Sequence, residues 1–150
     1  MTLFFPFRRA LAALAAALAL ASCGGGGQVV PFKPTRILAL GDELSLIEAD
    51  GRKHSINAFA TKVENGETVP DKTKLDCTLA PIWIQSVASA FSLPFDRCLG
   101  AATTAGGQVL AQAGHKVADL PAQLAAVQGG ALNDGDLALL MIGMHDILEL

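Results

Sequence analysis

Two short apolar runs stand out along the chain, at residues 37–40 and 137–142. Each contains only alanine, leucine, isoleucine and methionine, a pattern typical of strands that are buried on both faces. Gly41-Asp42 follows the first run and Gly143 follows the second, so both strands are predicted to end in a turn. Open α/β sheets carry their functional groups at the carboxyl ends of their strands. The residues directly after these two runs are therefore the first candidates for chemistry.

Helical spacing of apolar residues predicts two helices between these strands. The first covers residues 81–91, and the second covers residues 120–127 with Asp119 as a candidate N-cap. The residues expected to face the core are Trp83, Val87, Ala90 and Phe91 in the first helix, and Val117, Leu120, Leu124 and Val127 in the second. Strands and helices in this alternation predict an α/β fold whose parallel sheet has right-handed crossovers.

The segment between the first strand and the first helix is predicted to be largely irregular. Residues 46–49 and 54–59 are predicted as short strands joined by a tight turn at Asp50-Gly51. Residues 61–74 are polar and charged and contain the turn signal Asn65-Gly66. This composition predicts a surface loop.

Residues 1–22 are typical of a secretory signal. Arginines precede an alanine and leucine run at residues 10–21 that is too short to span a bilayer. The run Leu20-Ala21-Ser22-Cys23 also resembles the bacterial lipobox. This resemblance implies that Cys23 is lipidated and that membrane lipid anchors the exported protein to the bacterial cell envelope, with its domain in the periplasm or outside the cell. A plain cleaved signal with an incidental cysteine is the alternative.

Residues 23–35 are rich in glycine and proline and are predicted to form a tether between the lipid and a single domain at residues 36–150. The net charge is −3, and removal of Arg8 and Arg9 with the leader leaves 9 of the 11 basic side chains against 14 acidic ones. This balance gives no basic patch of the kind that nucleic-acid binding needs, so no nucleic-acid partner is expected.

Cys77 and Cys98 lie before and after the helix predicted at residues 81–91. In an exported protein an even pair of cysteines predicts a disulfide, which would stabilise the fold by roughly 3 kcal/mol in the chain-entropy estimate. A metal pair is the alternative, but the pair has no Cys-x-x-Cys spacing and no histidine nearby. We expect no metal and no other cofactor.

The residues after the first strand, Gly41-Asp42-Glu43-Leu44-Ser45, resemble the first sequence block of the SGNH/GDSL hydrolases, Gly-Asp-Ser-Leu-Ser. The first serine of that block is the family's nucleophile, and Glu43 stands in its place here. The resemblance therefore implies an esterase or lipase whose nucleophile has been replaced. Glu43 and Ser45 are the two candidate catalytic residues of this block.

Two further segments resemble the second and third blocks of the family. Gly114 best matches the glycine whose N–H helps form the oxyanion hole, although Gly106 or Gly107 are alternatives. The run from Gly143 to Asp146 resembles Gly-x-Asn-Asp, with His145 in place of the asparagine that donates to the oxyanion. An imidazole can also donate a hydrogen bond.

The resemblance covers residues 36–150 and implies a flavodoxin-like three-layer α/β/α sandwich. The family's Asp-x-x-His, which supplies the base and its orienting carboxylate, does not occur in the 150 residues. We therefore expect the sandwich to be incomplete at its carboxyl-terminal side, with a sheet edge or an apolar face uncovered.

Three functions remain open on the sequence. The first is an SGNH-type ester hydrolase lipoprotein that is catalytically impaired by Glu43. The second is a non-catalytic SGNH-like envelope lipoprotein that binds an ester, acyl or glycan ligand. In the third, Glu43 acts as a general base on water with assistance from His145. Against all of these, Glu43 could be a solvated or turn-capping residue with no chemical role.

Overall fold

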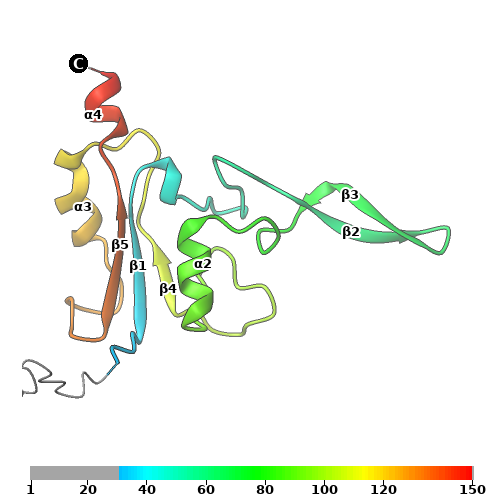
Figure 1. Ribbon diagram of the computed structural model, residues 1–150, viewed down its shortest axis with the longest axis horizontal. Coiled ribbons are helices and arrows are strands. Elements are labelled where there is room, and N and C mark those ends of the chain that lie inside the picture. Colours follow the sequence, from blue (N-terminus) through cyan, green and yellow to red (C-terminus); the bar gives the residue numbers. More distant parts are fainter. Residues whose placement is uncertain (1–30, 150) are drawn as a thin grey trace, which may run out of the picture. The chain divides into compact units, whose positions relative to one another are not determined.

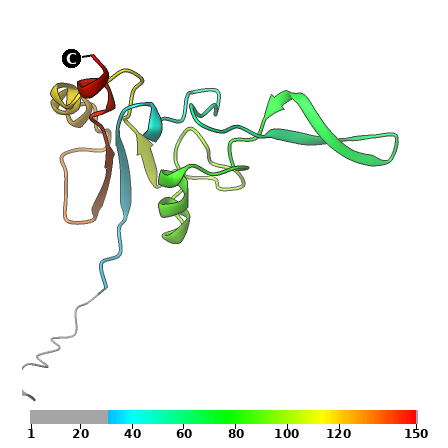
Figure 2. The same cartoon turned by 45° about the horizontal axis from the view of Figure 1, so that its top comes forward.

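The computed structural model describes residues 31–149. Its main sheet has three parallel strands, with β1 (Arg36–Gly41) between β4 (Gly107–Val109) and β5 (Asp136–Met141), as Figures 1 and 2 show. The two strands predicted from the apolar runs are confirmed, and they pair directly, with Gly41 opposite Met141 at the end of the ladder. The mixed α/β content and the parallel sheet are likewise confirmed.

The predicted leader, Cys23 and most of the predicted tether lie outside the described residues. Lipidation of Cys23 and anchoring to a membrane therefore stay predictions. Among residues 31–149, no helix is long enough and apolar enough to cross a membrane.

The core forms around β1 because its side chains are buried on both faces of the sheet. Ile37, Leu38 and Ala39 are each 0% exposed. Ile37 and Ala39 pack in one cluster with Ile84 and Phe95. Burial of a side chain of this size removes it from water and stabilises the fold by about 1.5–3 kcal/mol.

Strand β5 is buried less completely than its apolar sequence predicts. Leu139 packs in the core, whereas Leu140 is 51% exposed and Met141 is 41% exposed. Two apolar side chains of α4 (Met144–Leu148) are also exposed. Because side chains alternate along a strand, Ala138 and Leu140 lie on the same side of β5 and leave that apolar face uncovered among the described residues.

Helix α2 (Trp83–Ala90) confirms the first predicted helix and part of its predicted core-facing stripe, because Trp83 and Val87 pack against the core. Ile84 and Ala88 are the buried residues of α2, whereas Ala90 is exposed and Phe91 at the C-cap is 39% exposed. Each of the two buried residues follows a predicted one by a single position, so the buried face of α2 is rotated by about one residue from the predicted stripe.

The disulfide predicted around α2 is confirmed. Cys77 and Cys98 are bonded, and their Cα atoms are 5.7 Å apart. The bond joins the segment before α2 to the segment after it and so restrains the chain at both ends of the helix. The Gln85 side chain of α2 adds a hydrogen bond to the backbone carbonyl of Cys77 at 2.9 Å.

The strands predicted at residues 46–49 and 54–59 are wrong. Only an isolated bridge forms there, between Ile47 and Lys53. The tight turn at Asp50-Gly51 is present, with Gly51 at a φ of 81°. Extended pairing stops at once because the residues that follow are polar and exposed and have no neighbouring strand to join.

The surface loop predicted at residues 61–74 is also wrong. Strands β2 (Phe59–Glu64) and β3 (Glu67–Leu75) pair antiparallel across a two-residue turn at Asn65-Gly66. Both turn residues have positive φ, as the favoured hairpin turns require. The hairpin was missed because both of its faces are largely polar and exposed, so that no apolar alternation marks its strands.

The second predicted helix is shorter than expected and is not core-facing along the expected stripe. A 3₁₀ turn, η2 (Val117–Asp119), leads into α3 (Leu120–Ala125). Val117 is 52% exposed and Leu124 is 40% exposed, whereas Gln123 is the buried residue of α3. The side chain of Asp119 does not cap α3 and instead accepts the N–H of Lys116.

Candidate functional site

The carboxyl end of β1 turns sharply against the end of β5. Gly41 has a φ of 124°, and a Cβ atom there would overlap the carbonyl oxygen of Met141, so only glycine fits. The Met141 carbonyl oxygen also accepts the Asp42 N–H at 3.1 Å. The Asp42 carboxylate is buried and accepts the Leu44 N–H at 3.0 Å, which caps the 3₁₀ turn η1 (Glu43–Ser45). This turn fixes Glu43 at the edge of the sheet.

Glu43 is buried and lies where the ends of three strands meet. Its side chain accepts hydrogen bonds from His145 Nε2, at 2.8 Å to Oε1 and 3.0 Å to Oε2. Its Oε2 also accepts the Gly114 N–H at 3.1 Å. The fold therefore brings together Glu43 after β1, Gly114 after β4 and His145 after β5.

The contacts of Glu43 hold it as a carboxylate. Burial of the group favours the neutral acid and would raise its pKa. The N–H groups of Gly114 and of Glu43 itself, together with His145, outweigh burial and lower the pKa of Glu43 from 4.5 to about 2. A carboxylate that accepts three hydrogen bonds and binds protons so weakly is a poor general base at neutral pH.

His145 lies between two carboxylates. Its Nε2 faces Glu43, and its Nδ1 lies 3.4 Å from Glu149 Oε1. The hydrogen bond with Glu43 raises the pKa of His145 above its ordinary value of 6.5, against the opposing effect of burial, and Glu149 adds to the rise. A carboxylate oxygen thus faces each ring nitrogen of His145, and the protonated ring can donate to both.

Helix α4 and the segment after β4 are tied together on either side of His145. Lys116 Nζ contacts Glu149 Oε2 at 2.7 Å, and the Asp146 carboxylate accepts the Val117 N–H at 3.0 Å. Gly143 precedes α4 with a φ of 118°, a left-handed conformation that glycine permits. These contacts orient His145 independently of Glu43.

Ser45 is not placed for catalysis. Its side chain is 0% exposed, and its Oγ has no hydrogen-bond partner among the described residues. A serine nucleophile needs a base within hydrogen-bond reach, and none of the described residues supplies one to Ser45.

Gly114 lies in the cluster, while the alternatives Gly106 and Gly107 do not. Gly107 begins β4 and Gly106 precedes it, so both lie at the amino end of the sheet, where they pack against Leu93 and Phe95. Gly114 follows the carboxyl end of β4 and has an N–H that reaches Glu43.

Gln123 is a buried residue of the site that sequence reasoning missed. Its Oε1 accepts the Gly41 N–H at 2.8 Å, and its Nε2 donates to the Gly41 carbonyl at 2.8 Å. Its Nε2 also lies 2.8 Å from His115 Nδ1. The amide thus pairs with the backbone of β1 as a neighbouring strand would. No sequence signal marks it, because a glutamine on a short helix is ordinarily exposed.

Lys53 is a second buried polar residue that the sequence does not reveal. Its Nζ donates to the carbonyl oxygens of Cys77, Leu79 and Ala80 at 3.1, 2.7 and 2.8 Å. Burial lowers the pKa of Lys53, and Asp76 partly offsets that effect. The three bonds fix the segment that leads into α2.

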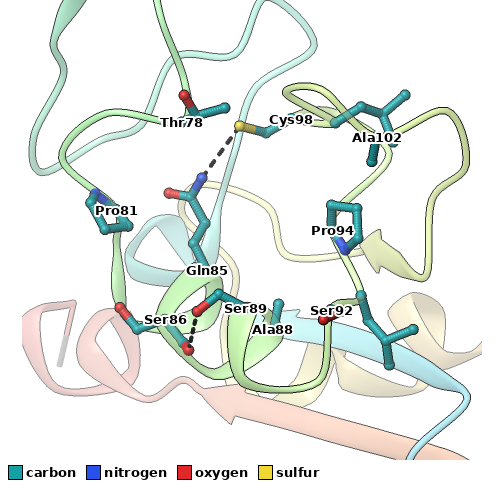
Figure 3. A pocket seen from close by; sticks show the side chains of 12 residues that line it. Thr78, Pro81, Gln85, Ser86, Ala88, Ser89, Ser92, Pro94, Cys98 and Ala102 are labelled. Atoms are coloured by element: carbon teal, nitrogen blue, oxygen red, sulfur yellow. Dashed lines mark hydrogen bonds between the residues drawn. The ribbon is translucent and has the colours of Figure 1, made fainter.

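Two cavities are relevant to ligand binding. One of about 270 Å³ lies beside Glu43, and its lining includes Leu46, His54 and Ala113. The other, of about 550 Å³, lies along α2 and next to the disulfide, and shares no lining residue with the first. Figure 3 shows the second cavity, with Ser86 and Ser89 on α2 and a hydrogen bond from the Gln85 side chain to Cys98 Sγ.

Comparisons with protein-family models, curated proteins and solved structures find no match for this chain. Its fold and its site are those of an α/β protein in which a buried carboxylate, Glu43, pairs with a histidine at the carboxyl ends of the parallel strands.

Proposed function

We propose that the chain is an exported lipoprotein with an SGNH-like domain in which Glu43 blocks ester hydrolysis. One observation carries this proposal. Gly114 and His145, the two groups expected to stabilise an oxyanion, both donate to the Glu43 carboxylate instead. Ester hydrolysis needs these donors to face the substrate carbonyl oxygen.

The proposed fold is the flavodoxin-like three-layer α/β/α sandwich of the SGNH hydrolases. It is supported by the parallel strand order β4-β1-β5 and by the burial of β1 on both faces. It is also supported by the position of the three matching segments, each of which follows the carboxyl end of a strand. The apolar face left uncovered at Ala138 and Leu140 is one that a helix layer of such a sandwich would cover.

The geometry disfavours the two catalytic alternatives. Ser45 is enclosed and has no base beside it among the described residues. Glu43 as a general base would need a free oxygen and a higher pKa, whereas both of its oxygens accept hydrogen bonds and its pKa is about 2. The burial of Glu43 also excludes a merely solvated role for it.

A second candidate function, binding of an acyl ligand, is favoured by the cavity along α2. Its volume of about 550 Å³ lies in the range of small-molecule sites, and none of the described residues that line it is charged. Apolar side chains such as Leu93 and Leu99 form most of the wall, and serine hydroxyls lie on α2. A neutral apolar group with an ester or hydroxyl end matches these surroundings.

Hydrolysis of a short-chain p-nitrophenyl ester tests the first proposal. The wild-type protein should show no turnover that a serine-directed phosphonate inhibits. Glu43→Ser should not restore turnover, because a hydroxyl on Cβ ends closer to the backbone than the carboxylate that reaches His145. A wild-type kcat/KM above about 10⁴ M⁻¹s⁻¹, the low end for enzymes, would overturn the proposal.

Labelling with fatty acid tests the lipoprotein part. Wild-type protein should incorporate the label in cells, and Cys23→Ser should not. Persistent labelling of Cys23→Ser would exclude lipidation at this cysteine.

Titration with a fluorescent acyl probe tests the second candidate. Ser89→Trp should fill the cavity and abolish binding, whereas Ser55→Trp, at an exposed residue away from the cavity, should bind as wild type does. Equal binding by both variants would show that the probe binds elsewhere.

A further inference from the structure

We infer that the Gly114 N–H and the His145 side chain form a receptor for a carboxylate, that Glu43 is its built-in occupant, and that acetate binds there when Glu43 is shortened. This receptor deepens the proposed function and rests on it in one respect, because both take Glu43 as the occupant of the expected oxyanion donors.

The donors of the receptor match a carboxylate. Glu43 Oε2 accepts from both Gly114 at 3.1 Å and His145 at 3.0 Å, while Oε1 accepts from His145 at 2.8 Å. These are ordinary lengths for hydrogen bonds to an ionised group. The protonated His145 ring supplies a positive charge. The Gly114 N–H supplies a second hydrogen-bond donor whose direction is fixed by the backbone.

The donors are held in place by contacts that do not involve Glu43. Glu149 contacts the other ring nitrogen of His145 and is itself paired with Lys116. Asp146 joins α4 to the segment after Gly114 through the Val117 N–H. The receptor is therefore expected to keep its geometry when the Glu43 side chain is shortened.

The size of the occupant identifies the ligand. Glu43→Ala keeps Cβ and removes one methylene and the carboxylate, which are the heavy atoms of acetate. Glu43 is 6% exposed, so the vacated space is enclosed on most sides. A cavity of about 270 Å³ is lined in part by Glu43, so the vacated space would adjoin it. Acetate can thus restore the contacts that the substitution deletes.

Thermal unfolding measured against acetate concentration tests the receptor. Acetate should raise the Tm of Glu43→Ala progressively in the millimolar range, at an ionic strength held constant with chloride, as expected for a ligand of four heavy atoms that binds only the folded state. Neutral acetamide should not raise it. Wild type and Glu43→Gln should not respond to acetate, because both keep the space filled.

A second arm locates the binding. Acetate should shift the amide resonance of Gly114 in Glu43→Ala, and the additional substitution His145→Gln should remove both this shift and the rise in Tm. If acetate raises the Tm of all variants equally, or of none, the inference is wrong. The inference is also wrong if Glu43→Ala is unfolded in chloride and remains unfolded when acetate is added.

A measurement on the wild-type protein keeps the inference testable without any variant. The ¹⁵N shifts of His145 should show both ring nitrogens protonated at pH 6, because the contacts with Glu43 raise the pKa of His145 above 6.5, and a neutral imidazole at that pH would overturn the receptor. Failure of the proposed function gives a different result: ester turnover by wild type contradicts that proposal and leaves acetate binding by Glu43→Ala unaffected.

Discussion

Strands β1 and β5 are joined by an ion pair at each end, and the two pairs differ in kind. At the amino end, Arg36 and Asp136 lie opposite each other in the ladder and form a fork, with Nε–Oδ1 at 2.7 Å and Nη2–Oδ2 at 2.6 Å. At the carboxyl end, Glu43 and His145 lie just beyond the strands, with Nε2–Oε1 at 2.8 Å. Each pair therefore bridges the same two strands.

The difference shows which end is built for structure and which is suited to binding. The Arg36 guanidinium is permanently charged, and it also donates to the carbonyl oxygens of Gln128 and Ala131. Its donors are thus committed to the fold. At the carboxyl end a titratable imidazolium and a backbone N–H converge on one carboxylate, which another anion could replace.

The largest expected loss of stability comes from a substitution in the turn that follows β1, at the carboxyl end of the sheet. Gly41→Ala should destabilise the protein by about 3 kcal/mol or more, because the new Cβ meets the backbone of Met141 and the φ of 124° is strained for alanine. Gly135→Ala at the amino end is the matched control. Its Cβ would meet the side chains of Thr35 and Asn133, which can rotate, so the loss should be clearly smaller. Equal losses in urea unfolding would contradict this account.

A smaller effect is expected from the two glutamines that bond to backbone. Gln123→Ala should cost about 1–3 kcal/mol, because it leaves the buried N–H of Gly41 without a partner, while the Gly41 carbonyl keeps the bond from the Gln112 N–H. Gln108 makes the same kind of two-bond contact with Gln128, but in an exposed position, so Gln108→Ala should cost only about 0.5 kcal/mol. The difference between these two free energies of unfolding is the measured quantity, and a value near zero would contradict the buried role of Gln123.

The two ion pairs should respond differently to pH. The folded pKa of His145 is raised above 6.5, so its contribution to stability is complete below pH 6.5 and is lost as pH rises through the folded pKa. The folded pKa of Glu43 is lowered from 4.5 to about 2, so its contribution is complete above pH 4.5 and is lost as pH falls toward 2. The carboxyl-end pair therefore stabilises most between pH 4.5 and 6.5.

The amino-end pair should not change on the alkaline side of this window, because the hydrogen bonds between Arg36 and Asp136 raise the already high pKa of Arg36 and lower the pKa of Asp136 from 3.8. Urea unfolding at pH 6 and pH 9 separates the two ends. The loss of stability between these pH values should diminish in His145→Gln and persist in Arg36→Gln. A loss that persists in His145→Gln and diminishes in Arg36→Gln would place the titrating group at the amino end and contradict this account.

The smallest expected effect is that of Glu149 on the pKa of His145. Glu149→Gln should lower the pKa of His145 slightly while leaving it above 6.5, because the hydrogen bond with Glu43 is the main cause of the rise. Glu48→Gln, at an exposed glutamate that makes no contact with His145 among the described side chains, should leave that pKa unchanged. NMR titration of the ring protons measures both. A large drop in Glu149→Gln would mean that Glu43 contributes less than proposed.

The sequence predicted the features that depend on continuous local signals. Buried strands leave apolar runs, and paired cysteines in an exported chain favour a disulfide, so β1, β5 and the Cys77–Cys98 bond could be found. Glu43 and His145 were expected near one sheet edge because both follow such runs. Their direct hydrogen bonds could not be predicted, because they depend on how η1 and α4 turn after the strands.

The features that the sequence did not reveal depend on contacts between distant residues. Gln123 and Lys53 are polar side chains that become buried only because distant backbone groups meet them. The β2–β3 hairpin has polar side chains on both faces, so its strands have the composition of a loop. The apolar face left at Leu140 likewise depends on what packs against β5, which a local pattern does not encode.

The central claim is that Gly114 and His145 hold Glu43 as a carboxylate in place of a substrate. The most direct test is a titration of the Glu43 side-chain carboxyl carbon by ¹³C NMR in the folded wild-type protein. The resonance should stay at its ionised position down to pH 3, as a pKa of about 2 requires. A midpoint at or above the ordinary value of 4.5 would show burial without effective donors and would contradict the claim.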